Sequence, residues 1–294
     1  MERTNKIILV TGATGRQGSV TTRYLLAGGW KVRALTRDAS APAALELSQR
    51  GAEVVQGDTN DRSSLDAAMQ GVYGVFNVQP PLGYDDDLRQ GKNVAEAALA
   101  ACVQHFVYTS VGGAQGQAAY RKLSKWEIEQ LIGALGLPAT ILRPAWYMDN
   151  MIGPRFGVPH GQLSTAIKPD VVVPLIAVDD IGAFVALAFD RPDEYLGKTI
   201  EIAGDALTMP QIAAAISRVL GRSIPYVQIS IETVRQQNAD VALVYDFVNE
   251  GSLQVDISAL RHLHPGLLDF DTWLRKTGKA TLGAWEQSNA RDML

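Results

Sequence analysis

The sequence of 294 residues predicts an α/β fold in which a doubly wound parallel sheet is followed by a smaller mixed α+β part. Two observations predict the sheet. Apolar runs of strand length alternate with helical patterns through the first half, which is typical of parallel strands joined by crossover helices. Near the N-terminus, an apolar strand breaks into three glycines and then enters a helix. A third observation predicts the second part, because the elements after Pro144 become shorter and of mixed type.

The first half is expected to hold six strands and the helices that connect them. The strands are expected at residues 7–10, 31–36, 53–56, 72–78, 105–109 and 139–142. Helices are expected at residues 19–27, 43–50, 63–69, 88–102 and 123–135. Right-handed crossovers then place the C-terminal ends of the strands, where ligands bind in such sheets, along one edge. Cys102 is expected on the apolar face of its helix, and thus in the core.

The second half is expected to form a smaller substrate-binding part. A Gly/Pro-rich stretch covers residues 153–161. Strands are expected at residues 171–173, 199–202 and 226–229, and helices at residues 179–189, 209–220 and 267–276, with a helix pair over 231–249. No low-complexity linker separates the halves. We therefore expect a nucleotide-binding domain over residues 1–150 and a substrate subdomain over residues 151–294, with some strands shared.

Composition excludes several classes of protein. The net charge is −4, and no run of Lys and Arg is present to neutralise a row of phosphates, so direct nucleic-acid binding is not expected. A single cysteine rules out an internal disulfide framework and a cysteine-based zinc site. No apolar stretch approaches the roughly 18 residues of a membrane span, and the N-terminus lacks a signal-peptide core. A cytoplasmic location without membrane contact is the expectation.

The first strand leads into Gly12, Gly15 and Gly18, which are spaced three apart. In a dinucleotide-binding turn, such glycines let the backbone turn sharply, approach the pyrophosphate and pack the helix closely on the strand. Free N–H groups at the helix N-terminus then meet the phosphates. The pattern indicates a Rossmann domain with cofactor contacts along this loop, namely Gly12, Thr14, Gly15, Arg16, Gln17 and Gly18.

The end of the second strand favours NADP(H) over NAD(H). An acidic residue there binds the ribose 2′-hydroxyl, whereas an arginine binds a 2′-phosphate. Arg37 comes first, and Arg16 offers a second guanidinium. In the alternative interpretation the strand ends one residue later and Asp38 faces the ribose. A third interpretation is that both arginines are exposed loop charges.

Polar residues also follow the next three strands. Their shared place at strand ends predicts contacts to the adenine, the ribose and the nicotinamide in turn, although each residue alone is also an ordinary loop residue, and Asp58 is also a turn-capping candidate. The predicted contacts are Asp58, Thr59, Asn77, Val78, Gln79, Thr109 and Ser110.

These motifs together resemble the NmrA-like family, an atypical branch of the short-chain dehydrogenases and reductases. The resemblance spans nearly the whole chain, and the residues that carry it are 10–18, 35–38, 51–58, 105–110, 142–150 and 178–182. It implies an NADP(H)-binding Rossmann fold, with Pro144 and Trp146 in a segment that lines the nicotinamide and substrate pocket. It also implies a helix start near Asp179 and Asp180, with one of them as the cap. The family includes working reductases and proteins that bind the cofactor only to report its redox state.

Reductases of the parent superfamily use a Tyr and a Lys four residues apart on one helix. Here Tyr120 and Lys125 are five apart, and the residue four before Lys125 is Arg121. The resemblance implies that Lys125 faces the cofactor, while an exposed helix lysine is the alternative. Tyr120 and Tyr147 are then the candidates for the proton donor, and Tyr147 is alternatively a packing aromatic.

The segment after Pro144 supplies the expected substrate contacts. These are Trp146, Tyr147, Met148, Asn150 and Met151, together with His160 from the Gly/Pro-rich stretch. Their apolar character predicts a reductase of a flat apolar acceptor, such as a quinone, an enone or an imine. The alternative function is a redox sensor that regulates a protein partner, and a third is non-redox chemistry on the same fold. His105 is expected to be structural, and His262 and His264 do not predict a metal site.

Overall fold

Buried strands form a seven-stranded sheet with the order β10-β6-β5-β4-β1-β2-β3 in the computed structural model, which describes residues 5–80, 83–120, 122–251 and 253–283. The registers from β3 to β6 are parallel throughout. Central strands such as β1 and β5 are buried almost end to end, as expected for a sheet that is covered on both faces. The predicted doubly wound sheet is confirmed. Its strands are β1 (Ile7–Val10), β2 (Lys31–Thr36), β3 (Glu53–Gln56), β4 (Val72–Asn77), β5 (His105–Thr109), β6 (Ala139–Pro144) and β10 (Thr199–Ile202).

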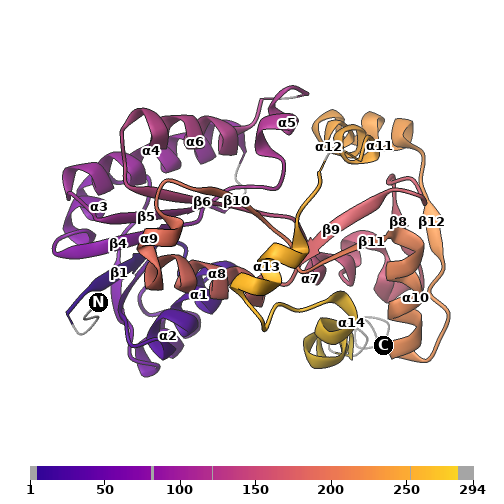
Figure 1. Cartoon of the computed structure of the whole chain (residues 1–294), viewed down its shortest axis with the longest axis horizontal. Helices are drawn as coiled ribbons and strands as arrows, with labels where there is room; N and C mark the ends of the chain where they lie inside the picture. The colour runs from indigo at the N-terminus through magenta and orange to yellow at the C-terminus, as the bar shows by residue number, and fades with distance from the viewer. Residues whose placement is uncertain (1–4, 81–82, 121, 252, 284–294) are drawn as a thin grey trace. The chain divides into compact units, whose positions relative to one another are not determined.

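Helices cover this sheet on both sides (Figure 1). Helices α3 (Arg62–Ala68), α4 (Tyr84–Ala100) and α6 (Ser124–Ala134) run along one side, and α1 (Arg16–Ala27), α2 (Pro42–Gln49) and α8 (Val178–Asp190) along the other. The short helix α9 (Pro192–Tyr195) precedes β10. Ala and Val residues of α4 pack on Val75, Phe106 and Tyr108 of the sheet.

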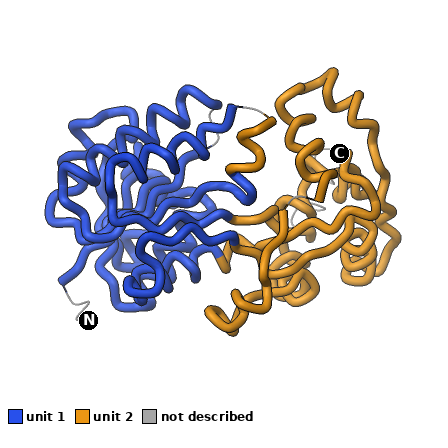
Figure 2. The backbone as a smooth tube through the Cα atoms, turned by 45° about the horizontal axis from the view of Figure 1, so that its top comes forward, with its two compact units in different colours: residues 1–114, 122–143, 181–201 blue, residues 115–121, 144–180, 202–294 orange. Residues whose placement is uncertain are grey.

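The chain divides into two units that interleave along the sequence (Figure 2). Unit 1 comprises residues 1–114, 122–143 and 181–201, and unit 2 comprises residues 115–121, 144–180 and 202–294. The chain therefore passes from one unit to the other five times, at residues 114/115, 121/122, 143/144, 180/181 and 201/202.

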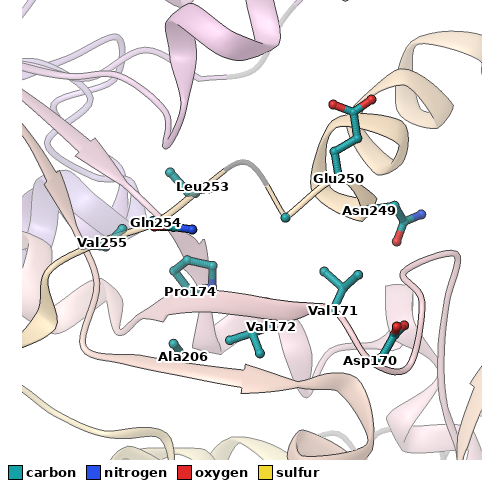
Figure 3. A pocket seen from close by; sticks show the side chains of 11 residues that line it. Asp170, Val171, Val172, Pro174, Ala206, Asn249, Glu250, Leu253, Gln254 and Val255 are labelled. Atoms are coloured by element: carbon teal, nitrogen blue, oxygen red, sulfur yellow. The ribbon is translucent and has the colours of Figure 1, made fainter.

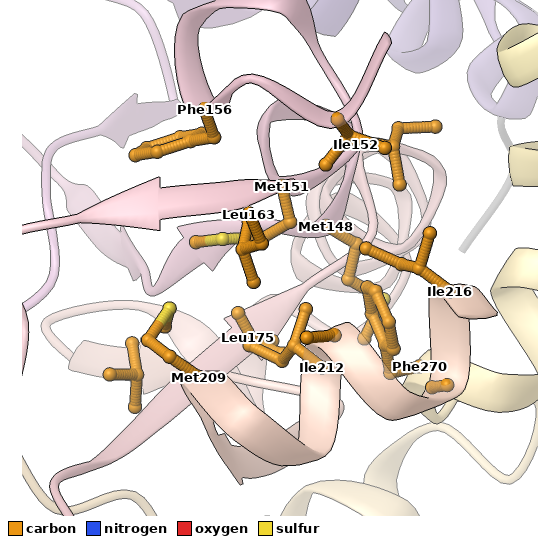
Figure 4. Close-up of a cluster of buried hydrophobic side chains, with 14 of the residues drawn as sticks. Met148, Met151, Ile152, Phe156, Leu163, Leu175, Met209, Ile212, Ile216 and Phe270 are labelled. Atoms are coloured by element: carbon orange, nitrogen blue, oxygen red, sulfur yellow. The ribbon is translucent and has the colours of Figure 1, made fainter. Parts of the chain in front are cut away.

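Unit 2 contains two small sheets, with orders β11-β9-β7 and β12-β8. Its strands are β7 (Trp146–Tyr147), β8 (Leu163–Thr165), β9 (Val172–Ile176), β11 (Asp205–Thr208) and β12 (Tyr226–Gln228). Its helices are α5 (Ala114–Ala118), α7 (Met148–Met151), η1 (Pro154–Phe156), η2 (Val158–His160), α10 (Met209–Leu220), α11 (Ile231–Gln237), α12 (Ala239–Asn249), α13 (Ile257–Leu263), α14 (Phe270–Trp273) and η3 (Leu274–Gly278). Figure 4 shows its separate hydrophobic core, in which α7 and α10 pack with Leu163, Leu175 and Phe270.

Two sequence expectations in unit 1 need correction. Helix α4 begins at Tyr84 and not at residue 88, because its first turn is the acidic Asp85, Asp86 and Asp87, which the helix dipole favours there. Cys102 is not in the core. It is exposed, lies beyond the C-cap of α4 and has a positive φ of 53°. Within the described residues, no helix is long and apolar enough to cross a membrane.

Candidate functional site

The loop between β1 and α1 has a backbone that requires glycine. Gly12 has a φ of 55°, in the left-handed region. A Cβ on Gly18 would overlap the carbonyl oxygen of Gly12 and lie 2.7 Å from Ala13 Cα. Gly15 is the N-cap of α1, and its N–H donates to the Gly12 oxygen at 2.9 Å. The predicted close packing of helix on strand is therefore present.

The N-terminus of α1 has neither a side-chain cap nor an acidic residue in its first turn. Thr14, Gly15 and Arg16 are exposed. Since the first N–H groups of a helix lack intrahelical partners and the helix dipole is positive at this end, the loop suits a phosphate group.

Thr11 joins the glycine loop to the end of β4. Its hydroxyl lies 3.1 Å from both Asn77 Oδ1 and the Val78 carbonyl oxygen, and it accepts the Val78 N–H at 3.0 Å. Asn77 and Val78 were predicted at the cofactor, whereas Thr11 was not. The sequence signal for Thr11 was its place directly after the first strand, opposite the polar end of another strand.

Three buried polar atoms at strand ends have no hydrogen-bond partner within the described part of the chain. They are Asn77 Nδ2, Gln79 Nε2 and Ser110 Oγ. Thr109, beside Ser110, donates its hydroxyl to Gln17 Oε1 at 3.0 Å and so connects β5 to α1. Buried polar groups are normally paired, so these atoms fit a ligand with a polar edge. These atoms and the glycine loop together fit a dinucleotide.

Arg37 and Asp38 follow β2 and are both exposed. Asp38 Oδ1 accepts from the Ser40 N–H at 2.8 Å and from the Ser40 hydroxyl at 2.6 Å. These hydrogen bonds lower the pKa of Asp38. The carboxylate of Asp38 thus holds its own loop, and the contact of Arg37 with the 2′-phosphate stays a prediction.

The loop after β3 is held by local hydrogen bonds. Asp58 Oδ1 accepts from the backbone N–H of Asn60 at 2.9 Å and from its side-chain amide at 3.0 Å. Asn93 donates to the carbonyl oxygen of Thr59 at 2.9 Å. The turn-capping role that was open for Asp58 is therefore present, and the adenine contacts of Asp58 and Thr59 stay predictions.

Lys125 lies in the first turn of α6 and is half-buried. Its Nζ donates to Gln79 Oε1 at 3.4 Å and lies 5.6 Å from the centre of the Tyr108 ring. Burial lowers the pKa of Lys125 to about 8, and the carboxylate of Asp87 acts in the opposite direction. The alternative of an exposed helix lysine is not what the structure shows. A lysine of this kind offers both a cation and a titrating proton near neutral pH.

Tyr120 is not on the same helix as Lys125. It lies in the turn after α5, in unit 2, and its hydroxyl donates to the Glu250 carboxylate. Its ring packs edge-on against Phe247 at 5.9 Å. The hydrogen bond to Glu250 raises the pKa of Tyr120. Arg121 lies outside the described residues.

The expected substrate segment falls in unit 2 and is partly core. Trp146 lies between Phe156 and Tyr245, with ring centres 6.3 and 6.2 Å away. Met148 and Met151 have no exposed surface and pack in the hydrophobic cluster of this unit (Figure 4). The remaining predicted contacts have some exposed surface: Tyr147 and Asn150 are half-buried, and His160 is exposed at the end of η2. Pro144 ends β6 and is buried.

A histidine and an aspartate of unit 2 form a pair that was not predicted from the sequence. His264 Nε2 lies 3.1 Å from Asp180 Oδ1, and Asp180 Oδ2 accepts the Leu268 N–H at 3.1 Å. Asp180 thus binds the 264–268 segment, while Asp149 accepts the N–H of Val178 at the start of α8. The described residues contain no group of three His, Cys, Asp or Glu side chains placed to hold a metal ion.

An open cavity of about 480 Å³ also lies in unit 2 (Figure 3). Val172 and Pro174 of β9 and Ala206 of β11 form one wall, and Leu253 and Val255 lie across from them. Glu250, the partner of Tyr120, is at its margin. The cavity is therefore lined by apolar and polar side chains in mixture, the polar ones being Asp170, Asn249, Glu250 and Gln254, and the hydrogen-bonded Tyr120–Glu250 pair lies beside it.

Comparison with known proteins decides the family. A model of the NmrA-like family matches residues 4–265. The chain belongs to the NmrA-like family. Among its relatives, a protein of Streptomyces griseus subsp. griseus named (4-alkanoyl-5-oxo-2,5-dihydrofuran-3-yl)methyl phosphate reductase is 34% identical over 232 residues, which cover 78% of this chain and 79% of that protein. An NAD(P)H azoreductase of Xenophilus azovorans is 31% identical over 243 residues, covering 78% and 79%.

The fold agrees with solved structures of this family. The crystal structure of NmrA, a negative transcriptional regulator in complex with NADP, superposes with a TM-score of 0.79 and 24% identity, covering 97% of this chain and 98% of that one. NmrA-like proteins thus include reductases and a regulator, and the predicted resemblance and α/β Rossmann fold are confirmed.

Proposed function

We propose that this NmrA-like protein is an NADP(H)-dependent reductase whose acceptor is flat and apolar, such as a quinone, an enone or an imine. The observation that carries the proposal is the glycine loop, whose closely packed backbone leads into a helix N-terminus without a side-chain cap or an acidic first-turn residue, as a pyrophosphate site requires. Relatives that are named reductases, at 31% and 34% identity, support the redox chemistry.

The bound cofactor supplies a hydride, so the chain has to bind and orient it. In this proposal, N–H groups of the glycine loop bind the pyrophosphate, and Arg37 binds the 2′-phosphate with Arg16 as a second cation. Asn77 Nδ2, Gln79 Nε2 and Ser110 Oγ, which have no partner among the described residues, are offered to the ribose and nicotinamide. Lys125 provides the cationic contact to the nicotinamide ribose.

Hydride transfer to a quinone or a conjugated carbonyl leaves an oxyanion that must take a proton. Lys125 suits this task, because burial lowers the pKa of its ammonium to about 8, close to neutral pH. Tyr147 and Tyr120 are the further proton donors that we propose, and water serves where they do not. The proposed acceptor contacts are Trp146, Tyr147, Asn150 and His160, since Met148 and Met151 have no exposed surface and belong to the core of unit 2.

The test is a steady-state assay of NADPH oxidation by the purified chain. A panel of benzoquinones, naphthoquinones, enones and azo dyes is offered, and absorbance of NADPH is followed with each. We expect at least one acceptor to be reduced, with NADPH preferred to NADH. Tight NADPH binding without turnover of any acceptor would contradict the reductase activity but not the cofactor site.

A redox sensor is the second candidate, and the position of Tyr120 favours it. The residue lies outside α6 and is bonded to Glu250, so that helix lacks a tyrosine proton donor. A sensor binds NADP and NADPH without turnover, and its affinity for a protein partner depends on which of the two is bound. We expect limited proteolysis to give different patterns with NADP, with NADPH and without cofactor if this function holds. Identical patterns in all three would contradict it.

A further inference from the structure

The contact between α4 and α6 contains two buried polar side chains, Asp87 and Ser124. Asp87 is 7% exposed and Ser124 is 5% exposed, although both lie on helices that cover a sheet. The hydroxyl of Ser124 donates to Asp87 Oδ2 at 3.3 Å. A carboxylate in such a place costs free energy unless a cation or hydrogen bonds compensate it. Lys125 follows Ser124 on α6, and the charge of Asp87 acts on its ammonium group.

Gln79 approaches Lys125 from the end of β4. It is 5% exposed, and its Oε1 accepts the Lys125 Nζ at 3.4 Å. Gly91 on α4 makes room for this amide, since a Cβ on Gly91 would lie 2.8 Å from Gln79 Nε2 and 2.6 Å from Ile128 Cγ1. The amide is therefore held by packing, with its oxygen directed to the lysine.

The two glutamates of α6 have partners of their own. Glu129 of α6 pairs with Arg143 at 2.6 Å, and Glu127 accepts the hydroxyl of Tyr84. Burial raises the pKa of Tyr108 on β5, so this tyrosine stays neutral. Asp87 is then the carboxylate whose charge acts on Lys125, and it opposes the effect of burial on the pKa of the lysine.

We propose that Gln79 and Asp87 are positioning residues for Lys125, with Gln79 fixing where the ammonium group lies and Asp87 supplying its counter-charge. The inference rests on the proposed function, in which Lys125 contacts the nicotinamide ribose. It adds that NADP(H) affinity depends on the charge state of Lys125, and that two residues outside its own helix set that charge state and position.

The test measures the dissociation constant of NADP by calorimetry between pH 6 and pH 10. For the wild type we expect affinity to fall on the order of tenfold as pH rises through about 8, because a charge-assisted hydrogen bond is lost. Lys125→Met should remove this fall. Asp87→Asn should move its midpoint to lower pH by roughly one unit, and Asp87→Glu should restore it. Gln79→Met should weaken binding at pH 7 severalfold without moving the midpoint.

The matched control is Asp85→Asn, which removes the same charge from the exposed side of the same helix turn. A cofactor-free readout is the titration of Lys125 by ¹³C NMR after reductive methylation, with Lys125→Met to assign the signal. If Asp87→Asn moves neither midpoint further than Asp85→Asn does, the positioning role is overturned while the cofactor site stands. If Lys125→Met binds NADP like the wild type at every pH, the proposed role of Lys125 at the cofactor fails. In that case, the NMR titration still decides whether Asp87 acts on it.

Discussion

Arg37 and Asp38 have opposite charges and different tasks. Asp38 is tied to Ser40 by two hydrogen bonds, whereas Arg37 is exposed at the end of β2. We expect Arg37→Ala to weaken NADP(H) binding by about 1.5–3 kcal/mol, the range for a charge-assisted hydrogen bond, and to leave NAD(H) binding nearly unchanged. Calorimetric titration with both cofactors measures this. Equal losses for the two would place the 2′-phosphate contact elsewhere, with Arg16 the first candidate.

Gly18 is the glycine of the loop that tolerates a side chain least. A Cβ there would overlap the backbone of Gly12, whereas a Cβ on Gly15 would lie 3.2 Å from the same carbonyl oxygen. We expect Gly18→Ala to abolish NADP binding and to lower the free energy of unfolding by about 1–3 kcal/mol, as overpacking does. Gly133→Ala is the matched control, because a Cβ at that helix position meets no atom within 4 Å. Unchanged cofactor binding by Gly18→Ala would show that the loop is not the phosphate site.

At the scale of elements, β5 begins with a buried histidine that was expected to be structural. His105 Nε2 lies 2.8 Å from Thr140 Oγ1, and the Thr140 hydroxyl in turn donates to the Tyr195 carbonyl oxygen at 2.8 Å. His105 therefore donates from Nε2 and connects β5 with β6. Burial lowers its pKa from 6.5 to about 4.

This histidine predicts a specific acid sensitivity. Between pH 6.5 and about 4, the unfolded chain binds a proton at His105 that the folded chain does not, so the free energy of unfolding falls as pH falls through that window. The loss is on the order of 3 kcal/mol. We expect His105→Gln to lose less stability than the wild type over this range in urea unfolding. The exposed His262→Gln should behave like the wild type, and equal pH dependence of all three proteins would contradict the assignment.

Elements with strong local signals were predictable from the sequence, and those set by tertiary pairing were not. The apolar runs of β1, β2, β3 and β5 match their expected bounds. Strands β8 and β11 have three and four residues and were missed, because their backbone partners β12 and β9 define them more than their own composition does. The start of α4 was missed because Asp85–Asp87 reads as a loop until the helix dipole is considered.

At the scale of the whole molecule, the candidate site residues belong to two units with separate hydrophobic cores. The glycine loop, the strand ends and Lys125 are in unit 1, which accounts for the clear cofactor prediction from sequence. Tyr120 and the 146–151 segment are in unit 2. Spacing along the chain did not reveal that Tyr120 is bonded to Glu250, because that contact spans 130 residues. The local apolar pattern likewise did not show that Met148 and Met151 are fully buried.

Cofactor binding should stabilise the folded chain. A ligand that binds only the folded state at 100 times its dissociation constant adds about 2.7 kcal/mol to the free energy of unfolding. We expect NADPH to raise the melting temperature measured by differential scanning fluorimetry, and Gly18→Ala to abolish this rise while retaining a cooperative transition. An equal shift in wild type and variant would mean that the cofactor binds away from the glycine loop.

In the proposed function, Lys125 acts on a cofactor that the chain uses for reduction. The most direct test of this role is Lys125→Ala, with NADPH binding by titration and NADPH oxidation by an active quinone measured in parallel. We predict that turnover falls far more than affinity, because misplacing the reacting groups by about 1 Å costs on the order of a hundredfold in rate. Loss of affinity with no turnover in the wild type would support the sensor instead. Unchanged binding and unchanged turnover in the variant would contradict the role of Lys125 at the cofactor.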